Sequence, residues 1–252
     1  MTASSVRFGS AVFKQVHVSV FYQESYPLLC PSVALITLRQ PHPHNHLPTN
    51  PHIHVAISQR VDCLCLSYFI EKKPWLTLDD PSTTQIKRQD NLWEKNCLEC
   101  FVALSEDSEY LEVNVSPNGA YNIYRFDDYR SPKNMPPTQD TLASLWIPMA
   151  LPTQITTPTP MTPMPNDHSQ QASQQASQQT NWHSRHVAIK LGDYRQLYAR
   201  QNKIAKFHQI HPCVILYRDD QPIYYAPHHA SPPDFHDRQY WQDWHNYHNQ
   251  QD

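Results

Sequence analysis

The chain has 252 residues, with 20 Lys and Arg against 23 Asp and Glu, which gives a formal net charge of −3. Basic residues are scattered along this weakly acidic chain, so we expect no nucleic-acid partner. The only glycines are Gly9, Gly119 and Gly192. Their wide separation excludes glycine-rich phosphate loops, dinucleotide-binding fingerprints and the glycine-flanked nucleophilic serine of many hydrolases.

The first twenty residues carry charges and a histidine within their apolar stretch, which is not typical of a secretory signal peptide. No stretch of the sequence has the roughly 18 uncharged apolar residues that a membrane-spanning helix needs. We therefore expect a cytoplasmic protein with no membrane partner. In that reducing compartment the six cysteines are expected to be free thiols.

Short β-branched and aromatic runs, separated by Pro, Asn, Asp and Ser, predict an all-β fold, either a sandwich or a barrel. The predicted strands are 12–22, 33–38, 54–58, 63–70, 97–104, 110–115, 120–126, 142–149, 186–191, 213–217 and 222–226. One short helix is predicted over 193–207, where Asp193 provides a cap.

Two low-complexity segments interrupt this pattern. Residues 41–51 form a His- and Pro-rich loop insertion, and residues 152–180 are rich in Pro, Gln and Ser, which predicts a disordered insertion. The remainder of 10–240 is predicted to be a single sandwich domain, followed by a polar C-terminal tail over 241–252.

Polar side chains recur on one face of two central predicted strands. Because side chains alternate across a strand, Glu99, Glu112 and Asn114 share a face when the Leu and Val residues between them point into the core. The sequence therefore predicts an exposed polar platform. Two neighbouring carboxylates need a ligand or a cation to neutralise them, and the cations nearest in sequence are Arg125 and Arg130.

Four sequence blocks occur in a fixed order: LWEKNCLECF at 92–101, EVNVSPNG at 112–119, YRFDDYR at 124–130, and YYAPH at 224–228 with PDFH at 233–236. Together they resemble the bacterial DOMON-like domains related to type 9 carbohydrate-binding modules. The resemblance covers roughly residues 10–240 and implies an antiparallel β-sandwich, with two sheets and about ten strands, as the runs above also suggest. In type 9 modules a Trp stacks on a sugar and a Glu six positions later binds its hydroxyls, a spacing that Trp93 and Glu99 reproduce.

The resemblance implies a non-catalytic module that binds a carbohydrate or a sugar-like small molecule. With the face argument, it gives these expected ligand-binding residues: Trp93, Glu99, Glu112, Asn114, Arg125, Tyr225 and His236. A flat aromatic face with planar polar groups is the chemistry a sugar site needs. The alternative is structural, with Trp93 as a core or rim aromatic and Glu99 paired with Arg125 to stabilise the sheet.

Two further functions stay open at this stage. Some DOMON relatives bind haem through Met or His ligands, and Met135 and Met149 keep this alternative open, although we expect no cofactor. A sandwich that mediates protein contacts without a small ligand is the other. No metal site is expected, because Cys97 and Cys100 fall on opposite faces of their strand and the histidines of 42–54 lie among prolines.

Overall fold

The computed structural model describes residues 7–8, 11–12, 33–40, 50–59, 63–79, 87–146, 181–191, 194 and 207–244. The chain divides into two compact units. One unit consists of Met1–Tyr26 and Leu151–Thr180, and its described strands, β1 (Arg7–Phe8) and β2 (Ala11–Val12), pair antiparallel. The other unit consists of Pro27–Ala150 and Asn181–Asp252. The single domain over 10–240 stays a prediction.

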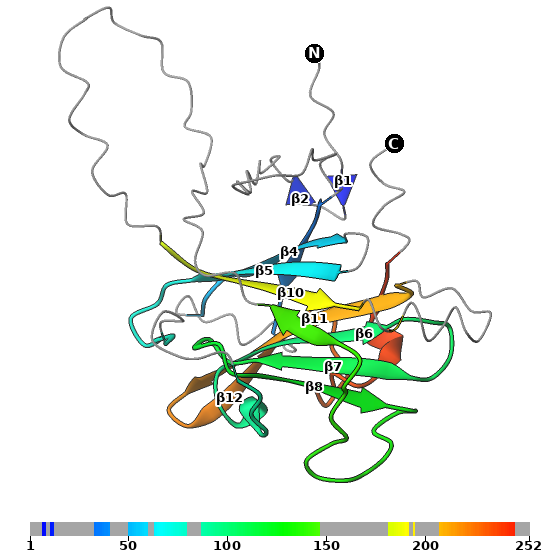
Figure 1. Cartoon of the computed structure of the whole chain (residues 1–252). Helices are drawn as coiled ribbons and strands as arrows, with labels where there is room; N and C mark the ends of the chain where they lie inside the picture. The colour runs from blue at the N-terminus through cyan, green and yellow to red at the C-terminus, as the bar shows by residue number, and fades with distance from the viewer. Residues whose placement is uncertain are drawn as a thin grey trace, which may run out of the picture. The chain divides into compact units, whose positions relative to one another are not determined.

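The second unit is a β-sandwich of two antiparallel sheets (Figure 1), which confirms the predicted fold class. The first sheet has the order β3 (Val33–Leu38), β4 (Ile53–Gln59), β5 (Cys63–Glu71), β10 (Trp182–Lys190) and β9 (Ser144–Trp146). The second has the order β12 (Gln221–Tyr225), β11 (Gln209–Arg218), β6 (Cys97–Ala103), β7 (Tyr110–Val115) and β8 (Tyr121–Phe126), and β13 (Gln242–Asp243) pairs with β11.

Most strands lie within a residue or two of the predicted bounds, and two begin four residues earlier. β10 begins at Trp182 rather than 186, because its polar first half pairs with β5 up to Glu71. β11 begins at Gln209 rather than 213 and contains Pro212, a residue that lacks the N–H of the ladder and so disfavours a strand in the sequence. Most of the predicted helix 193–207 and of the insertions 41–51 and 152–180 lies outside the described residues.

The core between the sheets follows from the two-residue period of the strands. In β5 the side chains of Leu64, Leu66, Tyr68 and Ile70 are buried, while their neighbours on the other face are mostly half-buried. They belong to one cluster with apolar side chains of the second sheet, namely Leu98, Cys100, Val102, Leu111, Val113, Val115 and Ile123. Cys97 belongs to a different cluster from Cys100, in agreement with the predicted opposite faces.

The other face of the second sheet is also covered, by a second apolar cluster that we call the outer cluster. Its members are Leu92, Cys97, Phe101, Ala103, Tyr110, Ala120, Tyr124, Phe126, Cys213, Ile215, Ala226, Phe235 and Trp241. The covering residues come from the 3-10 turn η3 (Leu92–Glu94) and from the segment after β12, which includes η4 (Arg238–Tyr240). Every residue of β6 and β7 is therefore buried.

Two expectations are corrected by this cover. The predicted exposed platform is a buried face, because the segment 226–241 lies over it. The predicted polar tail also begins too early, since Trp241 is buried in the outer cluster and Trp244 in the inter-sheet core. The indole Nε1 of Trp241 donates a 2.8 Å hydrogen bond to the carbonyl of Phe235, and this bond lies within the covering segment 226–241.

The outer cluster should contribute as much to stability as an ordinary core. Phe101 is 1% exposed, and its ring lies within 4.9–6.5 Å, centroid to centroid, of Tyr110, His211, Phe235, His236 and Trp241. We expect the substitution Phe101→Ala to lower the free energy of unfolding by about 3–5 kcal/mol, measured by urea denaturation.

The control for this prediction is Met135→Ala, because Met135 is 75% exposed. It should change the free energy of unfolding by less than about 0.5 kcal/mol. A loss of under about 1 kcal/mol in Phe101→Ala would show that the outer cluster is not a packed core.

Candidate functional site

The strand register brings the predicted polar residues together on the outer face of the second sheet. Glu99 in β6 stands opposite Asn114 in β7, and Asn114 stands opposite Asn122 in β8. Glu112 lies two residues before Asn114 on the same face of β7, opposite Tyr124. Glu99 is 3% exposed, Glu112 5% and Asn114 0%. These residues form a buried polar group rather than a surface.

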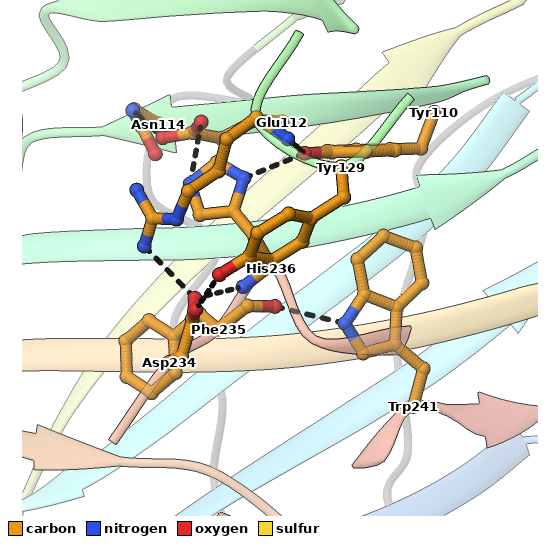
Figure 2. Close-up of polar contacts among 9 residues, drawn as sticks. Tyr110, Glu112, Asn114, Tyr129, Asp234, Phe235, His236 and Trp241 are labelled. Carbon is orange, nitrogen blue, oxygen red and sulfur yellow. Dashed lines mark hydrogen bonds and ion pairs between the residues drawn. The ribbon is translucent and has the colours of Figure 1, made fainter. Parts of the chain in front are cut away.

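A chain of polar contacts links this group to the covering segment (Figure 2). Asn114 Nδ2 donates a 2.8 Å hydrogen bond to Glu112 Oε1, and Glu112 Oε2 lies 3.6 Å from His236 Nε2. His236 Nδ1 shares a 2.7 Å hydrogen bond with the hydroxyl of Tyr110. Within the described residues, Glu99 Oε1 and Asn114 Oδ1 are buried without a hydrogen-bond partner.

Burial determines the protonation of these groups. It raises the pKa of Glu112 to about 7, against the opposing effects of the hydrogen bond from Asn114 and the charge of Arg130. Burial, followed by the charge of Glu112, raises the pKa of Glu99 well above its ordinary value. Burial and then Arg130 lower the pKa of His236 to about 3. His236 is therefore neutral near pH 7, and its contact with Glu112 is not a charged pair.

The covering segment is fastened by a second set of contacts around Asp234. Its carboxylate accepts hydrogen bonds from the Tyr129 hydroxyl (2.5 Å), from Arg130 Nη2 (2.8 Å) and from the backbone N–H of His236 (2.9 Å). The backbone N–H of Arg130 donates to the hydroxyl of Tyr110 at 3.1 Å. Hydrogen bonds thus join two of the four sequence blocks, 124–130 and 233–236.

Two predicted site residues lie elsewhere. Arg125 stands opposite Leu111 and so shares the face opposite to Glu112, where it pairs with Glu109 at 2.8 Å. Tyr225 is buried in the inter-sheet core, and its hydroxyl accepts a 2.9 Å hydrogen bond from Gln40 Nε2. The expectation that these two join the polar group is wrong, because both have the opposite strand parity.

Trp93 lies in η3 at the margin of the outer cluster. Its indole is half-buried and meets Tyr124 edge-on, with ring centroids 5.8 Å apart and planes at 66°. The carbonyl of Trp93 accepts a 3.2 Å hydrogen bond from the hydroxyl of Tyr217. η3 begins after Asn91, whose φ of 59° lies in the left-handed region that Asn tolerates better than most residues. The half-buried indole therefore packs against the outer cluster from its margin.

A cleft of about 400 Å³ lies beside this turn, and we call it the polar cleft. It is formed by 77–79, by 89–96 and by the hairpin turn between β7 and β8. Its lining residues are Thr77, Asp79, Gln89, Asp90, Asn91, Leu92, Glu94, Lys95, Asn96, Ser116, Pro117, Asn118 and Ala120. In the hairpin turn, Gly119 has a φ of 101°, and Asn118 Oδ1 accepts a 3.1 Å hydrogen bond from the N–H of Ala120.

The walls of the polar cleft are held by residues behind it. Asp90 Oδ1 accepts hydrogen bonds from Asn122 Nδ2 (2.7 Å) and from the hydroxyl of Tyr124 (2.8 Å), both on the outer face of β8. Arg185 in β10 donates to the carbonyls of Pro117 (3.0 Å) and Asp79 (2.6 Å). One guanidinium therefore ties two walls of the cleft together.

Sequence reasoning missed the polar cleft as a site. The signal was available in the polar run 89–96, which directly precedes β6, and in the turn 116–119, which directly follows β7. Because antiparallel neighbours start and end at the same edge of a sheet, these two segments had to lie close together.

The described residues contain no group of three or more His, Cys, Asp or Glu side chains placed to hold a metal ion. Met135 is strongly exposed on the loop after β8, and Met149 lies outside the described residues. No helix in the described part of the chain has the length and apolar character to cross a membrane.

The sandwich and the polar cleft define the class, an all-β protein with a small solvent-open polar site. No protein-family profile and no curated protein matches the chain. Among solved structures it is similar to a candidate carbohydrate-binding protein from Bacteroides uniformis. The two share 12% identity over 83% of this chain and 84% of that chain, with a TM-score of 0.48.

The raised pKa of Glu112 predicts a pH dependence of stability. Its folded value of about 7 lies above the ordinary 4.5, so its contribution is fully present below pH 4.5 and is lost as pH rises through 7. Glu112→Gln keeps the acceptor for Asn114 and cannot ionise. Relative to the unmodified chain, this variant should gain roughly 1–3 kcal/mol in unfolding free energy between about pH 4.5 and 8.5.

Urea denaturation at several pH values measures this difference. The lowered pKa of His236 acts in the opposite direction, since it costs stability as pH falls from 6.5 towards about 3, but both chains share that effect. The exposed Glu106 provides the control Glu106→Gln, which should show no such gain. Parallel curves for Glu112→Gln and the unmodified chain would mean that Glu112 is not buried.

Proposed function

We propose that this chain is a non-catalytic module that binds a small polyhydroxylated ligand, a carbohydrate, in the polar cleft. The observation that carries the proposal is the cleft itself, which has a volume in the range of small-molecule sites and a lining of carboxylates and amides. Planar polar groups of these kinds bind neighbouring sugar hydroxyls in pairs. The resemblance to DOMON-like and type 9 carbohydrate-binding domains supports the same class of ligand.

Several polar groups of the cleft are available to a ligand. Asp79, Glu94 and Lys95 are exposed, and no hydrogen bond or ion pair joins their side chains to the other described residues. Asp90, by contrast, is already held by Asn122 and Tyr124. We therefore assign the direct ligand contacts to Asp79, Glu94 and Lys95. Asp90 is a wall residue whose position its hydrogen bonds fix.

The buried polar group has a supporting role in this proposal. Glu99, Glu112 and Asn114 lie on the same sheet face as Asn122 and Tyr124, which hold Asp90 at the cleft. Their burial prevents direct contact with a sugar while the covering segment stays in place. We also propose a cytoplasmic location, consistent with the absence of a disulfide among the five described cysteines.

The affinity should be modest. A hydrogen bond to a charged group contributes about 1.5–3 kcal/mol net, so two or three of them, after the entropy of association, correspond to a Kd between about 1 μM and 1 mM.

Titration calorimetry against monosaccharides, amino sugars and short glucans tests the proposal. With the sugar that binds best, Glu94→Gln should weaken binding by roughly 10-fold or more, because it removes a charged hydrogen-bond acceptor. The control Glu106→Gln lies in the loop after the far end of β6 and should leave the Kd unchanged.

The same titration separates the cleft from the buried sheet face. Glu99→Gln should change the Kd by less than about threefold, a difference of under 1 kcal/mol. If Glu99→Gln abolishes binding while Glu94→Gln has no effect, the ligand reaches the sheet face and the cleft is the wrong site. Absence of binding across the whole panel would contradict the carbohydrate assignment.

A further inference from the structure

Two thiols lie side by side on the outer face of the first sheet. Cys63 and Cys65 are half-buried cysteines in β5 that form no disulfide, and their Sγ atoms are 3.8 Å apart. Residues two apart in a strand point to the same side, so the strand itself sets this pairing. The inter-sheet core lies on the other side, where Leu64 and Leu66 are buried. The thiol pair therefore faces away from the core.

The other described cysteines have a different environment. Cys97, Cys100 and Cys213 are each at most 1% exposed, and burial raises the pKa of all three thiols. Such cysteines are inert core residues. Cys63 and Cys65 thus differ from them both in access to solvent and in having a second sulfur at contact distance.

The sulfur separation matches one edge of a tetrahedral metal site. A Zn–S bond is about 2.3 Å, and two such bonds at the tetrahedral angle place the sulfurs roughly 3.8 Å apart. On the neighbouring strand β10, Lys190 stands opposite Cys63 and so shares its face. Thiolates are the preferred ligands of soft metal ions.

We propose that Cys63 and Cys65 form a two-thiolate site for a thiophilic d¹⁰ metal ion of the Zn²⁺ class. The chain supplies one edge of the coordination tetrahedron, and solvent or a small added ligand completes it. Binding releases the thiol protons to solvent without any change of oxidation state, so the apparent affinity rises with pH. This proposal is independent of the polar cleft and of the carbohydrate assignment.

Cadmium titration of the reduced full-length chain tests the site. Cd²⁺ is a suitable probe because cadmium bound to thiolate gives an ultraviolet charge-transfer band, which cadmium bound to the histidines does not. We expect one equivalent of Cd²⁺ per chain to develop the band, with higher affinity at about pH 8 than at about pH 6. Cys63→Ser and Cys65→Ser should each weaken binding by more than about tenfold, since even outer-sphere partners of a metal contribute 10–100-fold.

Serine is close in size to cysteine and both sites are half-buried, so these variants should keep the far-ultraviolet circular dichroism of the unmodified chain. Cys100→Ser is a buried control that should retain the band, and Cys30→Ser controls for the cysteine outside the described residues. Absence of the band, its persistence in both single variants, or its loss in Cys30→Ser would overturn a site made by this thiol pair.

Discussion

Burial of the β6–β7 pair on both faces is the constraint on which the rest of the structure depends. The inter-sheet core covers one face, and η3 with the segment after β12 covers the other. Carboxyl groups on a sheet covered in this way are removed from water, which disfavours their charged form. The raised pKa values of Glu99 and Glu112 and the neutral His236 all follow from this cover.

The cover also determines which polar groups of the second sheet are open to solvent. The segment that carries Phe235 and Trp241 closes the sheet face, whereas the edge at which β6 begins and β7 ends stays open as the polar cleft. The two regions are physically connected, because Asn122 on the closed face hydrogen-bonds Asp90 in the open cleft. The buried polar face thus fixes the position of Asp90 in the cleft. On the same face, Glu99 Oε1 and Asn114 Oδ1 are buried without hydrogen-bond partners among the described residues, which is unfavourable for folding.

Local periodicity was sufficient to predict most of the sandwich but not its cover. β7 has the predicted bounds because Leu111, Val113 and Val115 alternate with polar residues, and β3 has them because VALITL is an almost continuous apolar run. Alternation also assigned Glu99, Glu112 and Asn114 correctly to one face. It could not show that a segment more than a hundred residues later covers that face. The apolar residues Cys97, Phe101 and Ala103, which share the face of Glu99, were the available warning, since strands buried on both faces read as continuous apolar runs.

Site-specific carbon NMR of the two carboxyl groups, followed over a pH titration, tests the central claim of burial most directly. The resonance assigned to Glu112 should titrate near pH 7, and that of Glu99 well above the ordinary range of a glutamate. If both carboxyl groups instead titrate near 4.5, as they do in water, the face is open to solvent and the cover described above does not exist in solution.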